Sequence, residues 1–294
     1  MLSILIPTYN YNAFPLVSEL KEQADCLGID YEILVQDDCS DSKLNSANEE
    51  ITSLKNCSFF SNESNLGRGK NLNSLVAKAK FEWILFLDCD TFPTQKKFIE
   101  NYLKATANNS IIFGGIVYKN EKPEKEALLR WVYGQKREAL SVNDRNRNPA
   151  YSALTSNLLI QRNVFLSNQF DESITRYGYE DLVFLSDLKK KGVIVKHIEN
   201  PTYHLGLETS EQFLNKTKIA LENLKFITQN TNLDHSESKI LKIYNLLKKL
   251  YLTSLISFLF KKTERPITNN LLSSKPSLRL FDLYKLGYYC SIES

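Results

Sequence analysis

Short apolar segments that stop at a polar or acidic residue are the strongest constraint on how this chain can fold. Residues 3–7 are apolar, few and closed by a proline, which is typical of a buried strand. Residues 31–36 have the same character and stop at Asp37-Asp38. Residues 83–87 repeat the pattern and stop at Asp88-Cys89-Asp90. We therefore expect buried strands whose carboxyl ends carry polar side chains.

Helical patterns separate these strands. Residues 14–27 repeat apolar side chains at helical spacing, and Gly28 follows as a stop. Strands that alternate with helices predict an α/β fold, in which helices flank both faces of a mixed, mostly parallel, Rossmann-like sheet. Further strands are expected at residues 58–60 and 111–118, and further helices at residues 72–80 and 98–107.

The second half of the chain has a different pattern. From residue 208 to about residue 260 the apolar spacing is almost entirely helical. A polar stretch at residues 229–236 is expected to be a linker that separates the preceding part of the chain from a small helical C-terminal tail. Before it, we expect helices at residues 124–140 and 179–191, strands at residues 152–160 and 193–198, and a polar loop at residues 143–149.

Charge balance and cysteine content exclude several classes of protein. The 294 residues include 37 Lys and Arg against 34 Asp and Glu, a net charge of +3, which lacks the basic excess of a nucleic-acid-binding protein. Hydrophobic residues make up 43% of the chain, which is ordinary for a folded protein and excludes disorder throughout. The five cysteines form no CxxC pattern, and their odd number favours a reducing compartment such as the cytoplasm.

The apolar runs do not have the character of a signal peptide or a transmembrane helix. Residues 1–7 lack a basic region ahead of the apolar run. The longest run, residues 250–260, is shorter than the ~18 residues that a spanning helix needs. It is expected either to pack as a buried helix or to touch an anionic membrane surface. Two lysines flank it on each side, namely Lys248, Lys249, Lys261 and Lys262.

Polar side chains that follow the predicted strands should meet in space. Thr8-Tyr9-Asn10 follow the first strand, in the way that Asp37-Asp38 and Asp88-Cys89-Asp90 follow the others. Open α/β sheets bind ligands beyond the carboxyl ends of their strands. In an extended segment, residues two apart point to one side, so Asp88 and Asp90 would form an oxygen site for Mg²⁺ or Mn²⁺. A solvated turn is the alternative.

Two neighbouring segments carry further candidates. The Asp38 carboxylate is suited to accept hydrogen bonds from a nucleobase or a ribose, or to cap the next helix. Gly67-Arg68-Gly69-Lys70 lacks the hydroxyl residue and the spacing of a phosphate-binding P-loop. It is expected to be a flexible turn into a helix, whose N-terminus and cations either face an anion or lie in solvent.

The segment Tyr177-Gly178-Tyr179-Glu180-Asp181 opens an apolar helix with adjacent carboxylates. Such a pair either interacts with the helix dipole or supplies a general base for a hydroxyl acceptor. His197 lies in an apolar strand and is expected in the core. His204 lies in a loop, either as a third metal ligand or as a structural residue.

Together, these segments resemble the family 2 glycosyltransferases with a GT-A fold. The matching segments are Ile4-Leu5-Ile6-Pro7-Thr8-Tyr9-Asn10, Glu32-Ile33-Leu34-Val35-Gln36-Asp37-Asp38-Cys39-Ser40, Asn65-Leu66-Gly67, Trp83-Ile84-Leu85-Phe86-Leu87-Asp88-Cys89-Asp90 and Gly178-Tyr179-Glu180-Asp181. The last of these also resembles the acceptor-side motif of galactosyltransferase-type regions. The resemblance implies a GT-A catalytic domain at residues 1–229, with a nucleotide-binding half at 1–118 and an acceptor-side half at 119–229, followed by a helical extension at 230–294.

The resemblance also implies roles for individual residues. Asp181 would be the catalytic base, with Glu180 supporting the acceptor, although the residues alone leave either carboxylate as the base. Cys39 stands where the family usually has glycine, so the turn after Asp38 has to accommodate a side chain. Mn²⁺ or Mg²⁺ would be held on the diphosphate by Asp90, Asp88 and His204. The nucleotide site would include Pro7, Thr8, Tyr9, Asp38, Arg68 and Asp88.

The implied activity is metal-dependent, inverting transfer of a hexose from a nucleotide-diphospho-sugar, with UDP as the first choice of nucleotide. The acceptor would be a hydroxyl of a glycan or lipid-linked glycan in surface polysaccharide synthesis, in the cytoplasm and with or without peripheral contact to the inner membrane face. A non-catalytic nucleotide-sugar or glycan-binding subunit is one alternative. A nucleotidyltransferase is another, but the loop Thr8-Tyr9-Asn10-Tyr11-Asn12 lacks the glycine and cation that such an enzyme needs.

Overall fold

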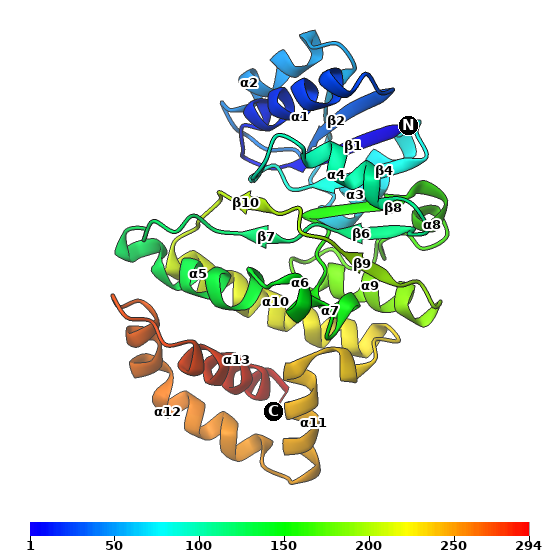
Figure 1. The fold of residues 1–294 in the computed structure, drawn as a ribbon. Coiled ribbons are helices and arrows are strands. Elements are labelled where there is room, and N and C mark those ends of the chain that lie inside the picture. The colour runs from blue at the N-terminus through cyan, green and yellow to red at the C-terminus, as the bar shows by residue number, and fades with distance from the viewer. Residues whose placement is uncertain (294) are drawn as a thin grey trace. The chain divides into compact units, whose positions relative to one another are not determined.

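The structure is a computed structural model that describes residues 1–293. In it, the short apolar segments pair as a mixed sheet with the strand order β3-β2-β1-β4-β8-β6-β9 (Figure 1). Strands β3, β2, β1 and β4 run parallel, whereas β8 runs antiparallel to its neighbours β4 and β6. The predicted mixed, mostly parallel α/β sheet is therefore confirmed. Its strands are β1 (Leu2–Thr8), β2 (Tyr31–Asp37), β3 (Cys57–Ser61), β4 (Trp83–Leu87), β6 (Ile111–Phe113), β8 (Asn157–Gln161) and β9 (Val195–His197).

Helices cover both faces of this sheet because successive strand residues point to opposite sides. On one face, Ile4 and Ile6 of β1 join a buried cluster with Leu16 and Leu20 of α1. On the other face, α3 packs against β1 and β2. Each fully buried aliphatic side chain contributes about 1.5–3 kcal/mol through burial. The helices of this region are α1 (Phe14–Leu27), α2 (Asn45–Glu49), η1 (Glu50–Ser53), α3 (Arg68–Lys78), α4 (Phe98–Ala105), α6 (Val142–Arg145), α7 (Pro149–Ser152) and α8 (Arg162–Leu166).

The described chain divides into two units that interrupt each other in sequence. The first unit holds the sheet and comprises Met1–Val117, Ala139–Thr175 and Val183–Gly206. The second comprises Tyr118–Glu138, Arg176–Leu182 and the chain from Leu207 onward. Helix α9 (Glu180–Lys190) begins in the second unit and continues in the first. The proposed domain boundary at residue 229 stays a prediction.

The predicted strand at residues 111–118 is split by two glycines. β6 ends at Phe113, and β7 (Ile116–Val117) belongs to a separate small sheet with β10 (Thr202–His204) and β5 (Thr91–Pro93). A methyl group at Gly114 would lie 2.3 Å from the carbonyl oxygen of Asn200, and Gly115 has φ +100°. The chain therefore turns where only glycine fits, and residues 111–118 form two short strands in two sheets rather than the one strand that was predicted.

The predicted polar loop at residues 143–149 is correct only in part, since residues 146–148 form a turn, whereas a short helix, α6, occupies residues 143–145. The Ser141 hydroxyl caps this helix by accepting a hydrogen bond from the backbone N–H of Asp144 at 3.2 Å. Arg145 then turns inward, where its guanidinium donates to the carbonyl oxygen of Ile198 at 3.0 Å and lies 5.2 Å from the centre of the Phe113 ring. A buried arginine thus gives a polar segment a structural role. The predicted strand at residues 152–160 likewise begins only at Asn157, because α7 ends at Ser152 and a turn precedes the strand.

The second unit is helical, as predicted for the C-terminal tail, and the helices continue beyond residue 260. Leu129 and Leu214 share a buried cluster with Phe260 and Phe281. Within the described residues, none of the helices combines the length and the apolar character that crossing a bilayer requires. The helices of this unit are η2 (Lys125–Ala127), α5 (Leu128–Tyr133), η3 (Gly134–Glu138, a π-turn), α10 (Ser210–Asn230), η4 (His235–Glu237), α11 (Lys239–Lys249), α12 (Thr253–Leu271) and α13 (Leu278–Glu293).

Candidate functional site

The carboxyl ends of β1, β2 and β4 meet at one edge of the sheet, as the sequence predicted. Thr8 pairs with Asp37 in the register of β1 and β2, and the backbone N–H of Asp38 donates to the carbonyl oxygen of Thr8 at 2.9 Å. β4 lies on the other side of β1, so Asp88 follows the next strand along. Thr8 is buried, whereas the Tyr9 side chain beyond it is 54% exposed and Pro7 is half-buried.

The Asp38 carboxylate holds the turn that leads into α3. Its Oδ1 accepts hydrogen bonds from the backbone N–H of Leu66 at 2.8 Å and from Asn62 Nδ2 at 2.9 Å. Its Oδ2 accepts from the backbone N–H of Gly67 at 2.9 Å. Gly67 has φ +80°, and α3 begins directly after it at Arg68 rather than at residue 72 as predicted. The turn that precedes the helix therefore donates its backbone N–H groups to the protein's own Asp38.

The turn after Asp38 does accommodate a side chain. Cys39 has φ +60°, a left-handed backbone that costs a non-glycine residue about 1–2 kcal/mol. Asp37 offsets this cost, since its carboxylate accepts hydrogen bonds from the backbone N–H of Ser40 at 2.8 Å and from Asn45 Nδ2 at 3.2 Å.

Arg68 lies in the first turn of α3 and joins two other segments. Its Nη2 lies 2.7 Å from Asp88 Oδ1, and its Nη1 donates to the Thr155 hydroxyl at 2.8 Å. Sequence reasoning missed Thr155, because it comes from a distant segment with no motif of its own. Lys70 extends elsewhere, with its Nζ 4.0 Å from Glu172 Oε2. Arg68 is therefore the cation of this turn that lies at the acidic edge.

Asp88 and Asp90 lie in a tight turn between β4 and β5. The backbone N–H and the hydroxyl of Thr91 both donate to the carbonyl oxygen of Asp88, at 3.1 and 2.7 Å. The assumption of an extended segment is therefore wrong, and the two carboxylates have different neighbours. Cys89 between them packs against the core, where burial raises the pKa of its thiol to about 12, so it carries no reactive thiolate.

His204 lies in strand β10 rather than in a loop as predicted, and it reaches Asp90 through the pairing of that strand. β10 pairs antiparallel with β5, which sets His204 opposite Thr91. His204 Nε2 lies 3.6 Å from Asp90 Oδ2, and the backbone N–H of Leu205 donates to the carbonyl oxygen of Asp90 at 2.7 Å. A methyl group at Gly206 would lie 2.1 Å from Asp90 Oδ2, so only glycine leaves this carboxylate where it is.

The donors at this edge fit a divalent cation that completes its ligand shell with a bound diphosphate. No group of three or more His, Cys, Asp or Glu side chains within residues 1–293 forms a ready metal cage. Asp90 and His204 together offer one carboxylate, a ligand that suits Mg²⁺ and Mn²⁺, and one imidazole, a common ligand of transition metals. Mg²⁺ and Mn²⁺ in nucleotide sites commonly take one or two carboxylates plus substrate phosphates.

The Gly178-Tyr179-Glu180-Asp181 segment lies in the second unit at the start of α9. Gly178 and Tyr179 have φ values of +99° and +70°, so two successive residues are left-handed. Asn223 of α10 holds this bend, since its Nδ2 donates to the carbonyl oxygen of Gly178 at 2.6 Å. Glu180 is 9% exposed and Asp181 is half-buried, both in the first turn of α9. Glycine adopts a positive φ without strain, so the strained residue of this bend is Tyr179, and a strained left-handed residue is more frequent at functional segments than elsewhere.

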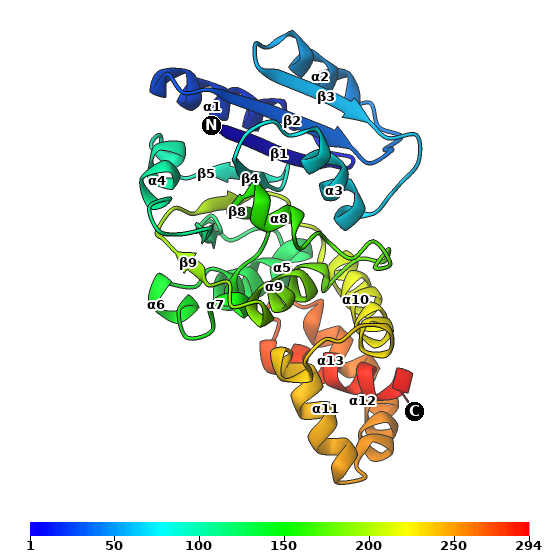
Figure 2. The ribbon, with the colours of Figure 1, turned by 90° about the vertical axis from the view of Figure 1, so that its right-hand side faces the viewer.

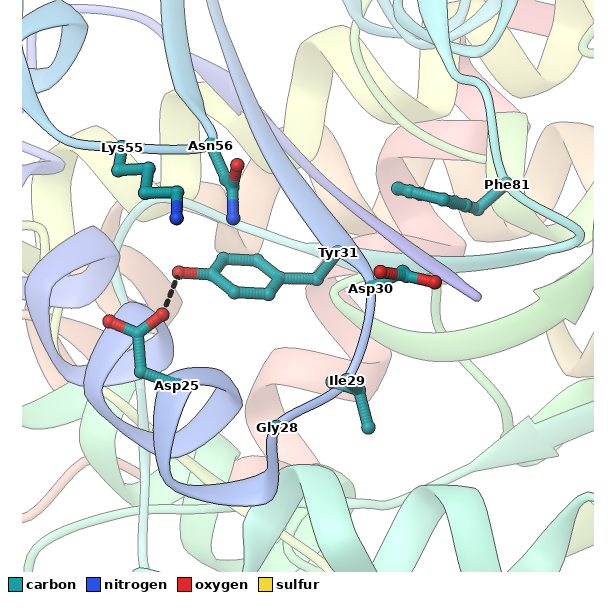
Figure 3. A pocket seen from close by; sticks show the side chains of 8 residues that line it. All are labelled: Asp25, Gly28, Ile29, Asp30, Tyr31, Lys55, Asn56 and Phe81. Carbon is teal, nitrogen blue, oxygen red and sulfur yellow. Dashed lines mark hydrogen bonds between the residues drawn. The ribbon is translucent and has the colours of Figure 1, made fainter.

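A separate hollow of about 370 Å³ lies at the opposite end of β2 (Figure 3). The hydroxyl of Tyr31 donates to Asp25 Oδ1 across it at 2.6 Å. It contains none of the predicted site residues, and it lies at the amino end of the strand rather than the carboxyl end. Its lining residues are Asp25, Gly28, Ile29, Asp30, Tyr31, Lys55, Asn56 and Phe81.

Comparison with protein families identifies the chain. The model described as Glycosyl transferase family 2 matches residues 3–165, which is more than half of the chain. The chain belongs to glycosyl transferase family 2. The match includes Asp38, Arg68, Asp88 and Asp90, whereas the Gly178-Tyr179-Glu180-Asp181 segment and His204 lie beyond it. No curated protein matches the sequence.

Solved structures support the fold of this family 2 glycosyltransferase. The mannosyltransferase PcManGT from Pyrobaculum calidifontis, in complex with GDP-Man and Mn²⁺, has a TM-score of 0.57 at 12% identity, over 98% of this chain and 84% of that chain. S. aureus TarS 1-349 has a TM-score of 0.53 at 17% identity, over 99% of this chain and 90% of that one. A longer S. aureus TarS structure has a TM-score of 0.51 at 18% identity, over 82% of this chain, which spans only 42% of that protein's length. These similarities confirm the predicted GT-A fold.

Proposed function

We propose that this family 2 glycosyltransferase transfers a hexose from a nucleotide-diphospho-sugar, with inversion, to a hydroxyl of a glycan or lipid-linked glycan. The observation that carries the proposal is the meeting of Asp38, Arg68, Asp88 and Asp90 at the carboxyl edge of the sheet, next to His204. Ligands of open α/β sheets bind beyond this edge. UDP is the nucleotide we favour, in the synthesis of a surface polysaccharide.

Residues of the first unit would hold the donor. Pro7, Thr8 and Tyr9 follow β1 and would line the nucleotide together with Asp38. Arg68 and Asp88 would position the ribose and the diphosphate. Asp90, Asp88 and His204 would hold Mn²⁺ or Mg²⁺, which supplies charge neutralisation of the diphosphate leaving group when it is bound. The similar folds of S. aureus TarS 1-349 in complex with UDP-GlcNAc and of PcManGT with GDP-Man and Mn²⁺ support a donor of this class.

Residues of the second unit would serve the acceptor. In the transfer step, the acceptor hydroxyl oxygen forms a bond to the anomeric carbon while the bond from that carbon to the diphosphate oxygen breaks. Asp181 would take the hydroxyl proton as general base, and Glu180 would support the acceptor. The resemblance of Gly178-Tyr179-Glu180-Asp181 to an acceptor-side motif supports this assignment, as does the strained left-handed backbone at Tyr179. A single displacement of this kind inverts the anomeric centre.

We place the reaction in the cytoplasm, with peripheral contact to the inner face of a membrane and without nucleic acid as a partner. A non-catalytic nucleotide-sugar or glycan-binding subunit is the second candidate. The two candidates differ in turnover, since only an enzyme releases the nucleoside diphosphate from its donor.

A donor panel tests the proposed function. The protein is incubated with UDP-glucose, UDP-galactose, UDP-GlcNAc and GDP-mannose, in Mn²⁺ and in EDTA, and the release of UDP or GDP is followed over time. We expect metal-dependent release from one donor by slow transfer to water, faster when a suitable acceptor is added. A folded protein that binds a nucleotide-sugar but releases no nucleoside diphosphate with any acceptor glycan would favour the binding subunit.

A further inference from the structure

The α11–α12 hairpin, residues 239–262, exposes apolar side chains that the second unit does not cover. α11 and α12 join through a short turn, and both views of the fold show them meeting there (Figures 1 and 2). Tyr251 at this turn is 92% exposed, and Leu250 beside it is 55% exposed. The other exposed apolar residues of the hairpin are Ile243, Leu246, Leu252, Leu255, Phe258 and Leu259.

Each helix of the hairpin has an exposed apolar face as well as a buried one. In α11, Leu241 and Tyr244 are buried, whereas Ile243 and Leu246 are exposed at a spacing of three residues. In α12, Phe260 is buried, whereas Leu255, Phe258 and Leu259 are exposed at i, i+3 and i+4. Residues at these spacings lie on one face of a helix. The outer face of a surface helix is ordinarily polar, so this face is built for contact with something apolar.

The hairpin is strongly basic. Residues 239–262 contain six lysines and no acidic residue, a charge of +6, whereas the whole chain has a net charge of +3. Lys262 lies with its Nζ 4.4 Å from the centre of the exposed Phe258 ring, so charge and apolar surface occupy the same face. Lysine stems of this kind keep the ammonium group in water while the side chain covers apolar surface. The partner must therefore have an anionic surface and an apolar layer beneath that surface.

We propose that the α11–α12 hairpin docks the protein on an anionic lipid bilayer. Leu250, Tyr251 and Phe258 would enter the interface between headgroups and acyl chains, and the lysines would contact the acidic headgroups. Tyrosine suits the interface between headgroups and acyl chains, because its ring is apolar and its hydroxyl group stays hydrated. The hairpin lies on the membrane and does not cross it, since none of the helices described in residues 1–293 has the character of a spanning segment.

Charge decides between this partner and a second copy of the chain. A symmetric dimer through this face would bring two surfaces of charge +6 together without any acid of the hairpin to neutralise them. An anionic bilayer supplies both the negative charge and the apolar layer. The hairpin is thus the surface that would make the membrane contact of the proposed function. The inference rests on that function only in the choice of a lipid-linked acceptor.

Co-sedimentation with vesicles tests the proposal on the full-length protein without donor or acceptor. We expect wild-type protein to pellet with vesicles that contain phosphatidylglycerol and to stay in solution with pure phosphatidylcholine. A variant with Lys248→Gln, Lys249→Gln, Lys261→Gln and Lys262→Gln should bind the anionic vesicles at least ~10²-fold more weakly, at about fivefold per lysine. The matched control, Lys122→Gln with Lys125→Gln, replaces two exposed lysines of the same unit and should bind as wild type does.

The apolar half of the surface needs its own variant. Leu250→Ser with Phe258→Ser should weaken binding at least ~10-fold, whereas Leu283→Ser, which changes an equally exposed leucine of α13, should not. Equal pelleting with and without phosphatidylglycerol, or no pelleting at all, would overturn the proposal. A concentration-dependent wild-type dimer that becomes a monomer in the Leu250→Ser, Phe258→Ser variant would assign the surface to a second copy instead. UDP binding by the same samples shows separately whether the donor site is intact.

Discussion

The Arg68 guanidinium lies 2.7 Å from the Asp88 carboxylate and also donates to the Thr155 hydroxyl at 2.8 Å. The side chains of Arg68 and Asp88 are 23% and 30% exposed, and an ion pair that remains in contact with water contributes only about 0–1 kcal/mol to stability. The pair therefore adds little to the fold. It holds a carboxylate and a guanidinium in place at the edge where the donor is proposed to bind.

Replacement of Arg68 should separate donor binding from stability. For Arg68→Met we expect a free energy of unfolding within about 1 kcal/mol of wild type. We expect UDP to bind at least ~10-fold more weakly, because a charge-assisted hydrogen bond to phosphate contributes about 1.5–3 kcal/mol. Calorimetry and urea unfolding measure the two effects. Lys70→Met is the matched control, since Lys70 lies beside Glu172, and equal UDP affinity in both variants would remove Arg68 from the donor site.

Gly206 offers a test of Asp90 that leaves the carboxylate in the sequence. The added methyl group of Gly206→Ala would lie 2.1 Å from Asp90 Oδ2, so the carboxylate has to leave its present position. We expect the variant to fold and to lose at least ~10-fold in the Mn²⁺-dependent part of UDP affinity, by calorimetry. Leu205→Ala, at the neighbouring residue, is the control and should retain that dependence. A Gly206→Ala variant with unchanged Mn²⁺ dependence would argue against Asp90 as a ligand.

The general base is tested by isosteric replacement in the first turn of α9. Asp181→Asn should leave UDP affinity unchanged and lower the rate of sugar transfer by at least ~10², the usual scale of general-base loss. Glu180→Gln should affect acceptor affinity more than the maximal rate. Initial rates over a range of acceptor concentrations distinguish these effects. If Glu180→Gln instead causes the larger loss of maximal rate, the two roles are exchanged.

Buried His197 should make the protein less stable in acid. Burial lowers the pKa of His197 to about 4, while an unfolded histidine titrates near ~6.5. The unfolded chain therefore binds more protons between these values, so stability is lost as the pH falls through this range, on the order of 3 kcal/mol in total. In His197→Gln this contribution to the pH dependence of the free energy of unfolding is absent. Urea unfolding at about pH 7 and pH 4.5 should show a smaller loss in the variant, whereas parallel losses would contradict it.

Local pattern was enough to predict the central sheet and the residues at its carboxyl edge. Strands β1, β2 and β4 are short apolar runs, and each is followed by the polar residue that lies at the edge. His197 was likewise predicted in the core and is 3% exposed. These features depend on residues that are neighbours in the sequence, so they can be predicted from local sequence pattern alone.

Long-range pairing places side by side residues that the local sequence pattern alone does not bring together. His204 lies beside Asp90 because β10 pairs with β5, and Thr155 meets Arg68 across two distant segments. Neither pairing leaves a periodic signal. The segment around Arg145 was predicted as a loop because polar residues there resemble solvent-exposed ones, yet Arg145 is 2% exposed and bonded to backbone carbonyls. Burial of a charged side chain depends on the folded surroundings rather than on its own sequence.

Calorimetric titration of UDP into the protein, in Mn²⁺ and in EDTA, tests most directly that the carboxyl edge of the sheet is a metal-dependent donor site. We expect wild-type protein to bind UDP in Mn²⁺ and at least ~10-fold more weakly in EDTA, and we expect Asp90→Asn to bind weakly in both. Wild-type and Asp90→Asn proteins that bind UDP equally well in Mn²⁺ would contradict this assignment, as would a folded wild-type protein that binds no nucleotide.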